Sequence, residues 1–479
     1  MVTSEVHFKM EKEVKLAIIG AGTAGLSAYK EASKYTRDIV VIDKGPLGST
    51  CARVGCMPSK VFIQAANDFH HRYLFKKQGI KGSDKLIVNV ADVLEYVRSM
   101  RDHFTEGVIE FTQSLHERFL CEQARFIAAD VLQAGPYTIK AEAIIIANGS
   151  HSIFPAEWSQ FRDKILTSET FFEQKNISNQ VGLIGAGSIG LELGQALSRL
   201  GVQVTAYHGN GFIGGLSDPK VNDTAVDLLT KEFPIFLNEM ASVVDAGNQL
   251  CIKTREKKYV DQVIAAMGRK PNLEKLGLEN LGIVLNEHGI PDFDSTTMQV
   301  KNHSIFIAGD VNQERPLLHE AADEGRIAAF NALNQSQCFR RRTPLRIIFT
   351  EPNIAVVGKG NQQLQGQDFI IGEIDFTNQG RAKVMQQNKG LLRIYADKKT
   401  AELLGAELIA PEGEHLAHLL AWAIDKKMTA FDVLQMPFYH PVIEEGMRTA
   451  LRQITKEAQE KRSSFDLAMC DSEAIHWLS

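Results

Sequence analysis

The sequence predicts an α/β protein made of two Rossmann-like units and a C-terminal α+β domain. An apolar run that ends in Gly-x-Gly-x-x-Gly occurs near residue 20 and again near residue 185, which predicts two strand–turn–helix units. After residue 344, strand-like apolar runs mix with two amphipathic stretches, which predicts an α+β layer. We expect the boundaries 1–152 for the first unit, 153–270 for the second, 271–343 for a return to the first, and 344–479 for the last domain.

The first unit carries the full pattern of a dinucleotide-binding turn. Gly20 allows a tight turn, Gly22 lets a pyrophosphate approach the backbone, and Gly25 lets the following helix pack on the strand. A second apolar run ends at Asp43, whose carboxylate suits ribose hydroxyls. The helix N-terminus offers free N–H groups to phosphates, so this unit predicts an ADP-containing cofactor.

The second unit repeats this pattern with one change. Gly185, Gly187 and Gly190 have the same spacing, but the ribose position is His208. This position holds neither an acid for a 2′-hydroxyl nor an arginine for a 2′-phosphate. The segment after His208 has no basic residue, which favours NAD over NADP, although a protonated imidazole could attract a phosphate. Two nucleotides in one chain imply that electrons pass between them.

Two cysteines follow the first unit, five positions apart. In an ideal helix, Cys51 and Cys56 would be separated by a rise of about 7.5 Å, beyond the Cα separation of about 7 Å that a disulfide tolerates. A bridge therefore needs a bent helix start, which Pro58 would cause and Gly55 would accommodate. Lys60 lies one turn beyond Cys56 on the same face, where its charge favours a thiolate.

The stretch 48–60 resembles the redox-active disulfide segment of the FAD-dependent pyridine nucleotide-disulfide oxidoreductases. This family includes dihydrolipoamide dehydrogenase, which the chain resembles most, glutathione reductase and mercuric reductase. The resemblance extends from about residue 14 to about residue 455. Within the segment, Ser49 replaces a usual glycine and Arg53 a usual asparagine. The resemblance implies that Cys51 exchanges with the substrate sulfur and that Cys56 lies against the flavin as a thiolate.

The same resemblance implies the cofactor contacts. FAD would be held by Gly20, Gly22, Gly25, Asp43, Lys44, Thr50, Lys60, Gly149, Gly309, Asp310 and Ala321. NAD would be held by Gly185, Gly187, Gly190, His208 and Gly268. In the family, an acid at the position of Glu192 pairs with the lysine of the disulfide helix beside the flavin, so we expect it to pair with Lys60. The alternative is that Glu192 is a solvated helix residue.

Residues 438–445 resemble the family's His-Pro-Thr-x-x-Glu signature, with Val442 in place of threonine. His440 would act as general base and acid, and Glu445 would orient its ring. A thiol with a pKa of about 8.5 needs such a proton acceptor to become a nucleophile at neutral pH. In the family this histidine reaches the disulfide of the other subunit, which implies a homodimer with shared active sites and an inactive monomer.

Composition excludes several classes of partner. A net charge of −5 over 479 residues gives no long-range attraction for nucleic acid or anionic membrane, so a small-molecule substrate is expected. No run of 18 apolar residues and no N-terminal apolar h-region occur, which predicts a soluble cytoplasmic protein. No paired CxxC spacing occurs, so no metal site is expected, and the pair His415 and His418 is read as solvated.

These features predict a homodimeric flavoprotein that passes two electrons between NAD(H), FAD, the Cys51–Cys56 disulfide and a small dithiol or disulfide. Dihydrolipoamide with NAD is the preferred pair. Glutathione reductase is less favoured because Arg53 alone supplies basic character near the disulfide. Mercuric reductase is less favoured because the tail holds one cysteine, Cys470, and no N-terminal metal-binding domain is evident. An NAD(P) transhydrogenase is less favoured because both sulfurs are present.

Departures from the family motifs favour one alternative of another class. In this alternative the protein is a flavin-bound scaffold or redox sensor without turnover. These departures are Ser49, Asn148, Met267 and Val442. Docking to a 2-oxo acid dehydrogenase complex is left open.

Overall fold

The computed structural model describes residues 10–462 and 466–467, so the expectation about Cys470 lies outside the described residues. The chain divides into two compact units. The first comprises Met1–Phe62, Val90–Ile177 and Met267–Arg341, and the second comprises Ile63–Asn89, Ser178–Ala266 and Arg342–Ser479. The four domain boundaries expected from the sequence stay a prediction.

The first unit is built on a nine-stranded sheet with β1 (Met10–Ile19) near its centre. Its main order is β17-β18-β19-β6-β1-β2-β3, and β5 and β4 continue antiparallel from β6. β1 runs parallel to both of its neighbours, as the strand–turn–helix–strand pattern requires. The other strands are β2 (Ile39–Ile42), β3 (Phe119–Leu120), β4 (Ala124–Ala128), β5 (Val131–Ala134), β6 (Tyr137–Ile146), β17 (Phe293–Asp294), β18 (Gln299–Val300) and β19 (Ile305–Ile307).

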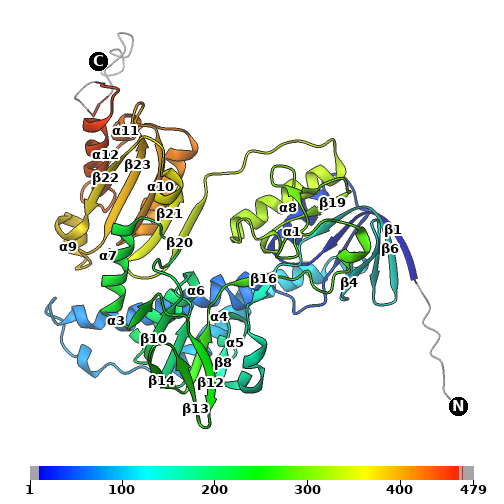
Figure 1. Ribbon diagram of the computed structural model, residues 1–479, viewed down its shortest axis with the longest axis horizontal. Helices are drawn as coiled ribbons and strands as arrows, with labels where there is room; N and C mark the ends of the chain where they lie inside the picture. Colours follow the sequence, from blue (N-terminus) through cyan, green and yellow to red (C-terminus); the bar gives the residue numbers. More distant parts are fainter. Residues whose placement is uncertain (1–9, 463–465, 468–479) are drawn as a thin grey trace. The chain divides into compact units, whose positions relative to one another are not determined.

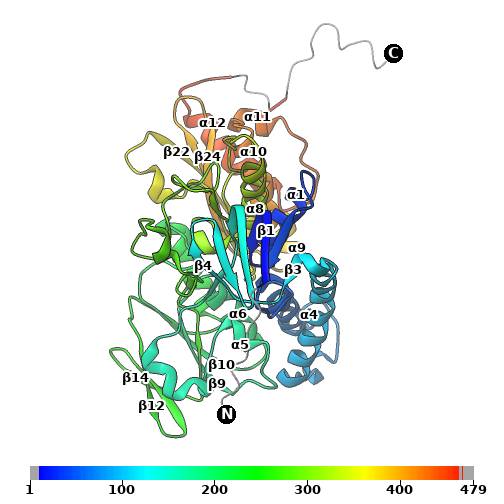
Figure 2. The same ribbon diagram turned by 90° about the vertical axis from the view of Figure 1, so that its right-hand side faces the viewer.

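Alternate residues of β1 enter two different cores. Leu16 and Ile18 pack with α1 (Thr23–Ala32) and α8 (Leu318–Leu333), which lie side by side on one face of the sheet (Figures 1 and 2). Ala17 and Ile19 point to the other face and pack with residues of β4 and β5. A parallel strand buried on both faces explains why this stretch reads as a continuous apolar run. The packing places the turn after β1 at the carboxyl edge of the sheet.

The remaining elements of the first unit carry the disulfide segment and the return of the chain. A two-stranded pair joins β7 to β16 antiparallel. Helix α3 starts in this unit and continues into the second. The bounds are α2 (Thr50–Val54), α3 (Cys56–Phe75), α4 (Val90–Gln113), β7 (Ser150–Ser152), β8 (Ile165–Leu166), α5 (Ser168–Phe171) and β16 (Arg269–Pro271).

The second unit contains the repeated strand–turn–helix. Strands β11, β10, β9 and β15 are parallel neighbours in that order, and α6 follows the glycine turn. A separate antiparallel sheet, β12-β13-β14, lies in this region and was not predicted from the sequence (Figure 2). The bounds are β9 (Gln180–Ile184), α6 (Ser188–Arg199), β10 (Gln203–His208), α7 (Pro219–Thr230), β11 (Ile235–Leu237), β12 (Ser242–Ala246), β13 (Gln249–Lys253), β14 (Lys257–Val260) and β15 (Gln262–Ala265).

The C-terminal part of the second unit is an antiparallel sheet with helices, which confirms the expected α+β layer. Its strand order is β20-β21-β24-β23-β22. A single apolar core joins the sheet to α10 and α12. The bounds are β20 (Leu345–Ile348), β21 (Asn353–Gly358), β22 (Phe369–Asp375), α9 (Gly380–Val384), β23 (Leu391–Asp397), β24 (Leu403–Ala410), α10 (Gly413–Asp425), α11 (Ala430–Leu434) and α12 (Glu445–Glu457). Within the described ranges, none of the helices combines the length and apolar character that crossing a bilayer requires.

Candidate active site

The first glycine turn has the geometry of a phosphate cradle. Gly20 has φ +110°, a conformation that side chains rarely adopt, and a Cβ on Gly25 would lie 1.9 Å from the carbonyl oxygen of Gly20. A Cβ on Gly22 would meet nothing within 4 Å, so the backbone there faces open space. Asp43 Oδ2 accepts a hydrogen bond from the amide N of Ala21 at 2.6 Å. Asp43 therefore holds the turn through Ala21, and the backbone at the start of the helix stays open.

The second turn reproduces these contacts with different chemistry at one position. Gly185 has φ +105°, and a Cβ on Gly190 would lie 1.9 Å from the carbonyl oxygen of Gly185. His208 Nδ1 takes the hydrogen bond from Ala186 N at 3.2 Å that Asp43 takes in the first turn. Its Nε2 lies 3.0 Å from the carbonyl oxygen of Phe212, which can only accept, so the ring proton resides on Nε2. Both ring nitrogens of His208 are thus engaged by backbone groups.

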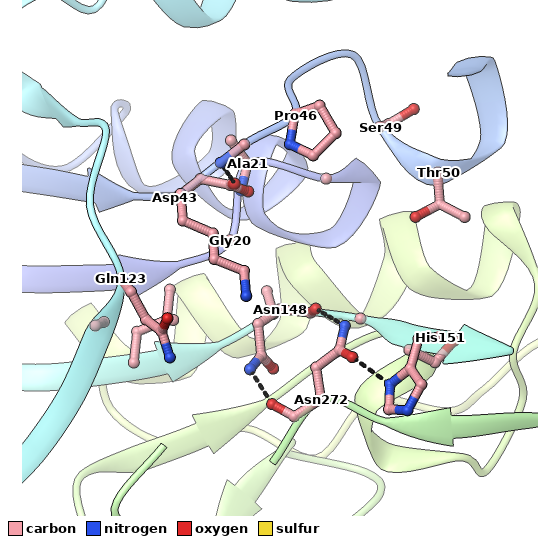
Figure 3. A pocket seen from close by; sticks show the side chains of 18 of the residues that line it. Gly20, Ala21, Asp43, Pro46, Ser49, Thr50, Gln123, Asn148, His151 and Asn272 are labelled. Carbon is pink, nitrogen blue, oxygen red and sulfur yellow. Dashed lines mark hydrogen bonds between the residues drawn. The ribbon is translucent and has the colours of Figure 1, made fainter. Parts of the chain in front are cut away.

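A cavity of about 440 Å³ opens beside the first turn. Most of the FAD residues expected from the sequence line it: Gly20, Gly22, Asp43, Lys44, Thr50 and Gly149. Figure 3 shows Asp43 bonded to Ala21 at one wall and a chain of hydrogen bonds through Asn148, Asn272 and His151 at another. The cavity lies within the first unit and within the usual size range of small-molecule sites.

Asn148 and Asn272 form one wall of this cavity. Each side-chain amide donates to the backbone carbonyl oxygen of the other residue, with Asn272 Nδ2 lying 2.7 Å from the carbonyl of Asn148. Asn148 stands where the family usually has threonine, and its Oδ1 is buried without a hydrogen-bond partner among the described residues. Since buried polar atoms are nearly always paired, this oxygen is an exception among the described residues. No sequence motif indicated a role for Asn272.

Asp310 and Gly309 are held by groups that the sequence did not reveal. Asp310 Oδ2 accepts from Ser150 Oγ at 3.0 Å, and Gly309 N donates to Glu324 Oε2 at 2.7 Å. Glu324 is completely buried and forms an ion pair with Arg341 at 2.6 Å. Burial raises the pKa of Glu324 although the ion pair and the Gly309 amide oppose that shift. Glu324 is thus a positioning residue for the strand end that carries Asp310.

The two cysteines lie on separate helices. α2 ends at Val54, Gly55 takes φ −122° and ψ −116°, and α3 begins at Cys56. A Cβ on Gly55 would lie 3.0 Å from the carbonyl oxygen of Thr50. The helix is therefore interrupted at Gly55, where the sequence suggested a bend. This interruption brings the thiols of Cys51 and Cys56 within hydrogen-bond contact.

The two thiols titrate as a pair. The hydrogen bond to Cys56 is the largest cause that raises the pKa of Cys51, followed by burial, while the more distant charge of Lys60 opposes the shift. The Cys51 thiol is therefore harder to deprotonate than a free thiol, and the role of Cys56 as the thiolate stays a prediction.

Ser49 replaces a glycine at a position with a left-handed backbone. Its φ is +61°, which a glycine would adopt without strain. In compensation, Ser49 Oγ accepts from Ala52 N at 3.3 Å and caps α2. The departure from the family motif thus leaves the start of the disulfide helix intact.

His440 and Glu445 form a hydrogen-bonded pair at the start of α12. His440 Nδ1 lies 3.1 Å from both carboxylate oxygens of Glu445, and the His440 side chain is 79% exposed. Partial burial opposes the shift, but the hydrogen bond with His440 lowers the pKa of Glu445. An ionised Glu445 carboxylate accepts the proton of His440 Nδ1. Nε2 is then the ring nitrogen that can exchange a proton with a substrate. The roles of both residues stay a prediction.

The structure corrects one reading of Glu192. This side chain is only 6% exposed, and its Oε1 accepts from Phe349 N at 2.9 Å, so Glu192 is not a solvated helix residue. Its expected pairing with Lys60 stays a prediction, because the two residues belong to different units. Gly268 likewise belongs to the first unit, apart from Gly185 and Gly187, and its expected contact with NAD stays a prediction.

Comparison with known families matches the chain almost throughout. Residues 14–325 match the pyridine nucleotide-disulphide oxidoreductase family, and residues 345–451 match the dimerisation domain of that family. The chain belongs to this family. Membership confirms the predicted fold class, oxidoreductase chemistry with FAD and NAD(P) as cofactors, and a dimerisation domain that supports a homodimer.

Curated relatives in this family include dihydrolipoyl dehydrogenases. The enzyme of Geobacillus stearothermophilus is 28% identical over 448 residues, which cover 90% of this chain and 94% of that one. The mitochondrial enzyme of Rattus norvegicus is 29% identical over 461 residues, covering 91% and 90%. Two solved structures share the fold at 21% identity: LpdA from Mycobacterium tuberculosis (TM-score 0.81, covering 92% and 100%) and the HOCl-induced flavoprotein disulfide reductase RclA from Escherichia coli (TM-score 0.80, covering 91% and 99%).

The residues around the cavity fit FAD, the family's flavin cofactor. The open cradle at Gly22 and the free N–H groups at the start of α1 suit a pyrophosphate. When bound, FAD supplies the hydride chemistry, and the chain supplies binding and orientation.

A buried charge network in the second unit holds the C-terminal half of α3. Arg199, whose side chain is 1% exposed, forms ion pairs with Glu232 and Glu351 and donates to Asn67 Oδ1 on α3 at 2.7 Å. Glu351 also pairs with His71 of α3 at 2.9 Å. Burial opposes the shift, but His71 and Arg199 together lower the pKa of Glu351 to about 2. The helix that begins at Cys56 is thus anchored by charges some four turns from the sulfur.

Replacing Glu351 by glutamine is expected to lower stability in a pH-dependent way. The folded pKa lies below the unfolded value, so the contribution, roughly 3 kcal/mol, is present at neutral pH and is lost as pH falls from about 4.5 toward 2. The stability gap between wild type and E351Q should therefore be largest near pH 7 and shrink below pH 5. Urea unfolding at pH 7, 5 and 4 measures it, with the exposed Glu157→Gln as control. A gap that is independent of pH would contradict this account.

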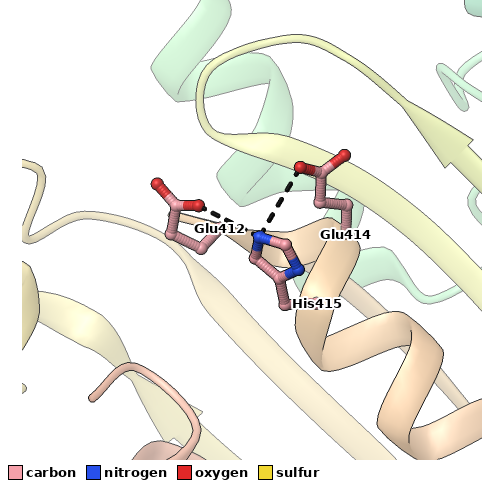
Figure 4. Close-up of side chains that lie close together, drawn as sticks. All are labelled: Glu412, Glu414 and His415. Carbon is pink, nitrogen blue, oxygen red and sulfur yellow. Dashed lines mark ion pairs between the residues drawn. The ribbon is translucent and has the colours of Figure 1, made fainter.

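Glu412, Glu414 and His415 cluster at the start of α10 (Figure 4). His415 Nε2 lies 3.5 Å from Glu412 Oε2 and 3.7 Å from Glu414 Oε1. All three side chains are partly or fully exposed, and the ion pairs account for their arrangement. His415 is 58% exposed, in line with the solvated position expected from the sequence, and we assign no metal to this cluster.

Proposed function

We propose that this protein is a dihydrolipoamide dehydrogenase-like enzyme that moves two electrons from a small dithiol, through the Cys51–Cys56 pair and FAD, to NAD. The observation that carries the proposal is the placement of Cys51 and Cys56 on either side of the Gly55 interruption. The names of the curated relatives favour dihydrolipoamide as the dithiol. Glutathione reductase, mercuric reductase and transhydrogenase activities are the alternatives within the family.

The sulfur steps balance as two thiol–disulfide exchanges. With the pair in its disulfide form, a substrate thiolate attacks Cys51 Sγ and the Cys51–Cys56 bond breaks, leaving a thiolate on Cys56. The second substrate sulfur then attacks the mixed disulfide and releases Cys51 as a thiol, so the substrate leaves as a disulfide. The electron pair resides on the protein dithiol until it passes onward to the nicotinamide.

His440 would serve these exchanges by taking the proton of the attacking thiol. The Glu445 carboxylate accepts from Nδ1, stabilises the imidazolium and leaves Nε2 for the substrate proton. In the proposed homodimer this imidazole serves the sulfur pair of the partner subunit. The exposure of His440 supports this role, because an exposed imidazole can be covered by a second copy of the chain.

Hydrogen bonding at His208 supports NAD over NADP. A 2′-phosphate requires a cation or a donor, but both nitrogens of His208 are already occupied by Ala186 N and the Phe212 carbonyl. Protonation at Nδ1 would place two donors face to face at Ala186 N, which removes that hydrogen bond. His208 therefore offers little attraction to a phosphate.

Wild type is expected to show a higher kcat/KM for NADH than for NADPH at both pH 6 and pH 8. His208→Asp should widen this preference about tenfold, because the carboxylate keeps the acceptor for Ala186 N and adds one for the ribose 2′-hydroxyl. The exposed His288→Asp serves as the charge-matched control. A preference of wild type for NADPH at both pH values would contradict the assignment.

Anaerobic reduction tests the proposed function as a whole. Dihydrolipoamide and, separately, NADH should each produce a long-wavelength absorption band from a thiolate beside oxidised flavin. A flavin-bound scaffold without turnover would give this band with neither reagent. Steady-state rates with lipoamide, oxidised glutathione and mercuric ion then rank the alternatives, and a higher kcat/KM with one of the last two would replace dihydrolipoamide as substrate.

A further inference from the structure

Arg53 is a charged residue of the flavin cavity to which the family comparison gives no role. It lies on α2 one turn after Thr50, and Thr50, Arg53 and Val54 all line the cavity. Residues spaced three and four apart share one helix face, so this face of α2 is turned toward the cofactor. Cys51 lies on the same short helix, outside the cavity lining.

One nitrogen of the Arg53 guanidinium has no partner among residues 10–462 and 466–467. This atom, Nε, is buried without a hydrogen bond, and no carboxylate in the described chain forms an ion pair with Arg53. An unpaired buried donor on a charged group is costly, so such groups normally have a partner. Because Arg53 also lines the cavity, a group that enters the cavity is the candidate partner.

Arg269, a second guanidinium in the same cavity, gives a direct contrast. Its Nε donates to Ser150 Oγ at 2.9 Å, its Nη2 donates to the Ser150 carbonyl at 2.7 Å, and its Nη1 pairs with Glu169 at 2.8 Å. The chain itself therefore satisfies Arg269. In contrast, the chain leaves Nε of Arg53 without a partner.

We propose that Arg53 binds the pyrophosphate of FAD, adding a side-chain cation to the backbone cradle at Gly20–Gly22. The cavity in which Arg53 lies is bounded by Gly20, Gly22 and Asp43, the residues of the dinucleotide turn. The planar guanidinium matches two phosphate oxygens at once, and it offsets the charge of a group that carries two negative charges. This inference concerns FAD affinity and does not depend on which disulfide is the substrate.

Release of FAD from diluted holoenzyme, followed by flavin fluorescence, tests the proposal. Arg53→Asn is expected to raise the Kd for FAD roughly tenfold or more, and Arg53→Lys should fall between Arg53→Asn and wild type. Raising the salt concentration should weaken FAD binding in wild type more than in R53N, because the lost contact is ionic. Arg37→Asn, which removes an exposed arginine of the same unit, should leave the Kd unchanged.

The flavin midpoint potential separates a contact with the pyrophosphate from one with the ring. The pyrophosphate has the same charge in both redox states, so R53N should lose affinity for both forms equally and keep the wild-type potential. A cation at the ring would favour the reduced form, and a tenfold difference between the forms would lower the potential of R53N by about 30 mV. Such a drop would overturn the proposal, as would wild-type FAD affinity in R53N. If R53N is not recovered folded, R53K with wild-type Kd and wild-type salt dependence would overturn it.

Discussion

Cys51→Ser is expected to abolish disulfide turnover, by roughly a thousandfold or more, while FAD stays bound at wild-type stoichiometry. Serine cannot form the mixed disulfide through which both exchanges pass. The cavity residues that fit FAD do not include Cys51, so cofactor binding should not change. Steady-state dihydrolipoamide oxidation and the flavin absorbance of the purified variant measure the two properties separately.

Cys338→Ser is the matched control for this variant. Cys338 is an exposed free cysteine of the same unit, and it lies far from Cys51 in the sequence. This control should keep wild-type turnover. Retained turnover in C51S would assign the nucleophile to another residue, and loss of FAD in C51S would show that the serine disturbs the cofactor site.

His440→Gln is expected to lower turnover by about 10²- to 10⁴-fold, the range typical of a lost general acid–base group. Glutamine keeps a polar side chain of similar length but cannot shuttle a proton. Glu445→Gln should lower turnover by a smaller factor than His440→Gln. The imidazole remains in this variant and loses only the carboxylate that lies 3.1 Å from its Nδ1. Measurements of kcat and kcat/KM across pH 6 to 9 should show that H440Q loses the pH-dependent limb of wild type. An unchanged profile in H440Q would exclude His440 as the proton carrier.

Mixing the two inactive variants tests whether the active sites are shared between subunits. A C51S–H440Q heterodimer would contain one site with both defects and one site with neither. Dissociation and random reassociation of the two homodimers should therefore restore about a quarter of wild-type activity. If cysteine and histidine acted within one subunit, every site would carry one defect and no activity would return.

The sequence predicts both nucleotide turns well because their geometry depends on local spacing. The close approach of Gly25 to Gly20, and of Gly190 to Gly185, follows from five-residue spacing alone. The position of Asp43 behind the first turn likewise follows from a strand of fixed length. In contrast, the sequence pattern showed only that His208 departs from the usual acid at this position. The tautomer of His208 depends on the Phe212 carbonyl, and the loop that brings this carbonyl to the ring leaves no sequence pattern.

Contacts between distant segments account for what the sequence did not reveal. Arg341 lies just before the boundary expected at residue 344, yet its side chain is 8% exposed and pairs with Glu320 and Glu324. The partner of a charged residue is decided by the tertiary path of the chain, and no local pattern records it. The same holds for Glu351. Its side chain contacts His71, Arg199 and Gln387, which are far apart in the sequence. The sequence signal that could have identified Glu324 is an acidic residue in the helix that follows the predicted cofactor strand.

The interruption at Gly55 has a mechanical consequence for repeated turnover. Closing a disulfide draws two sulfurs from contact to a bond of about 2 Å, and reduction lets them part again. The residue between α2 and α3 is a glycine, so a change in the distance between the two sulfurs need not break the hydrogen-bond ladder of either helix. The oxidised and reduced forms should therefore share one scaffold, with reorganisation confined to a hinge of one residue.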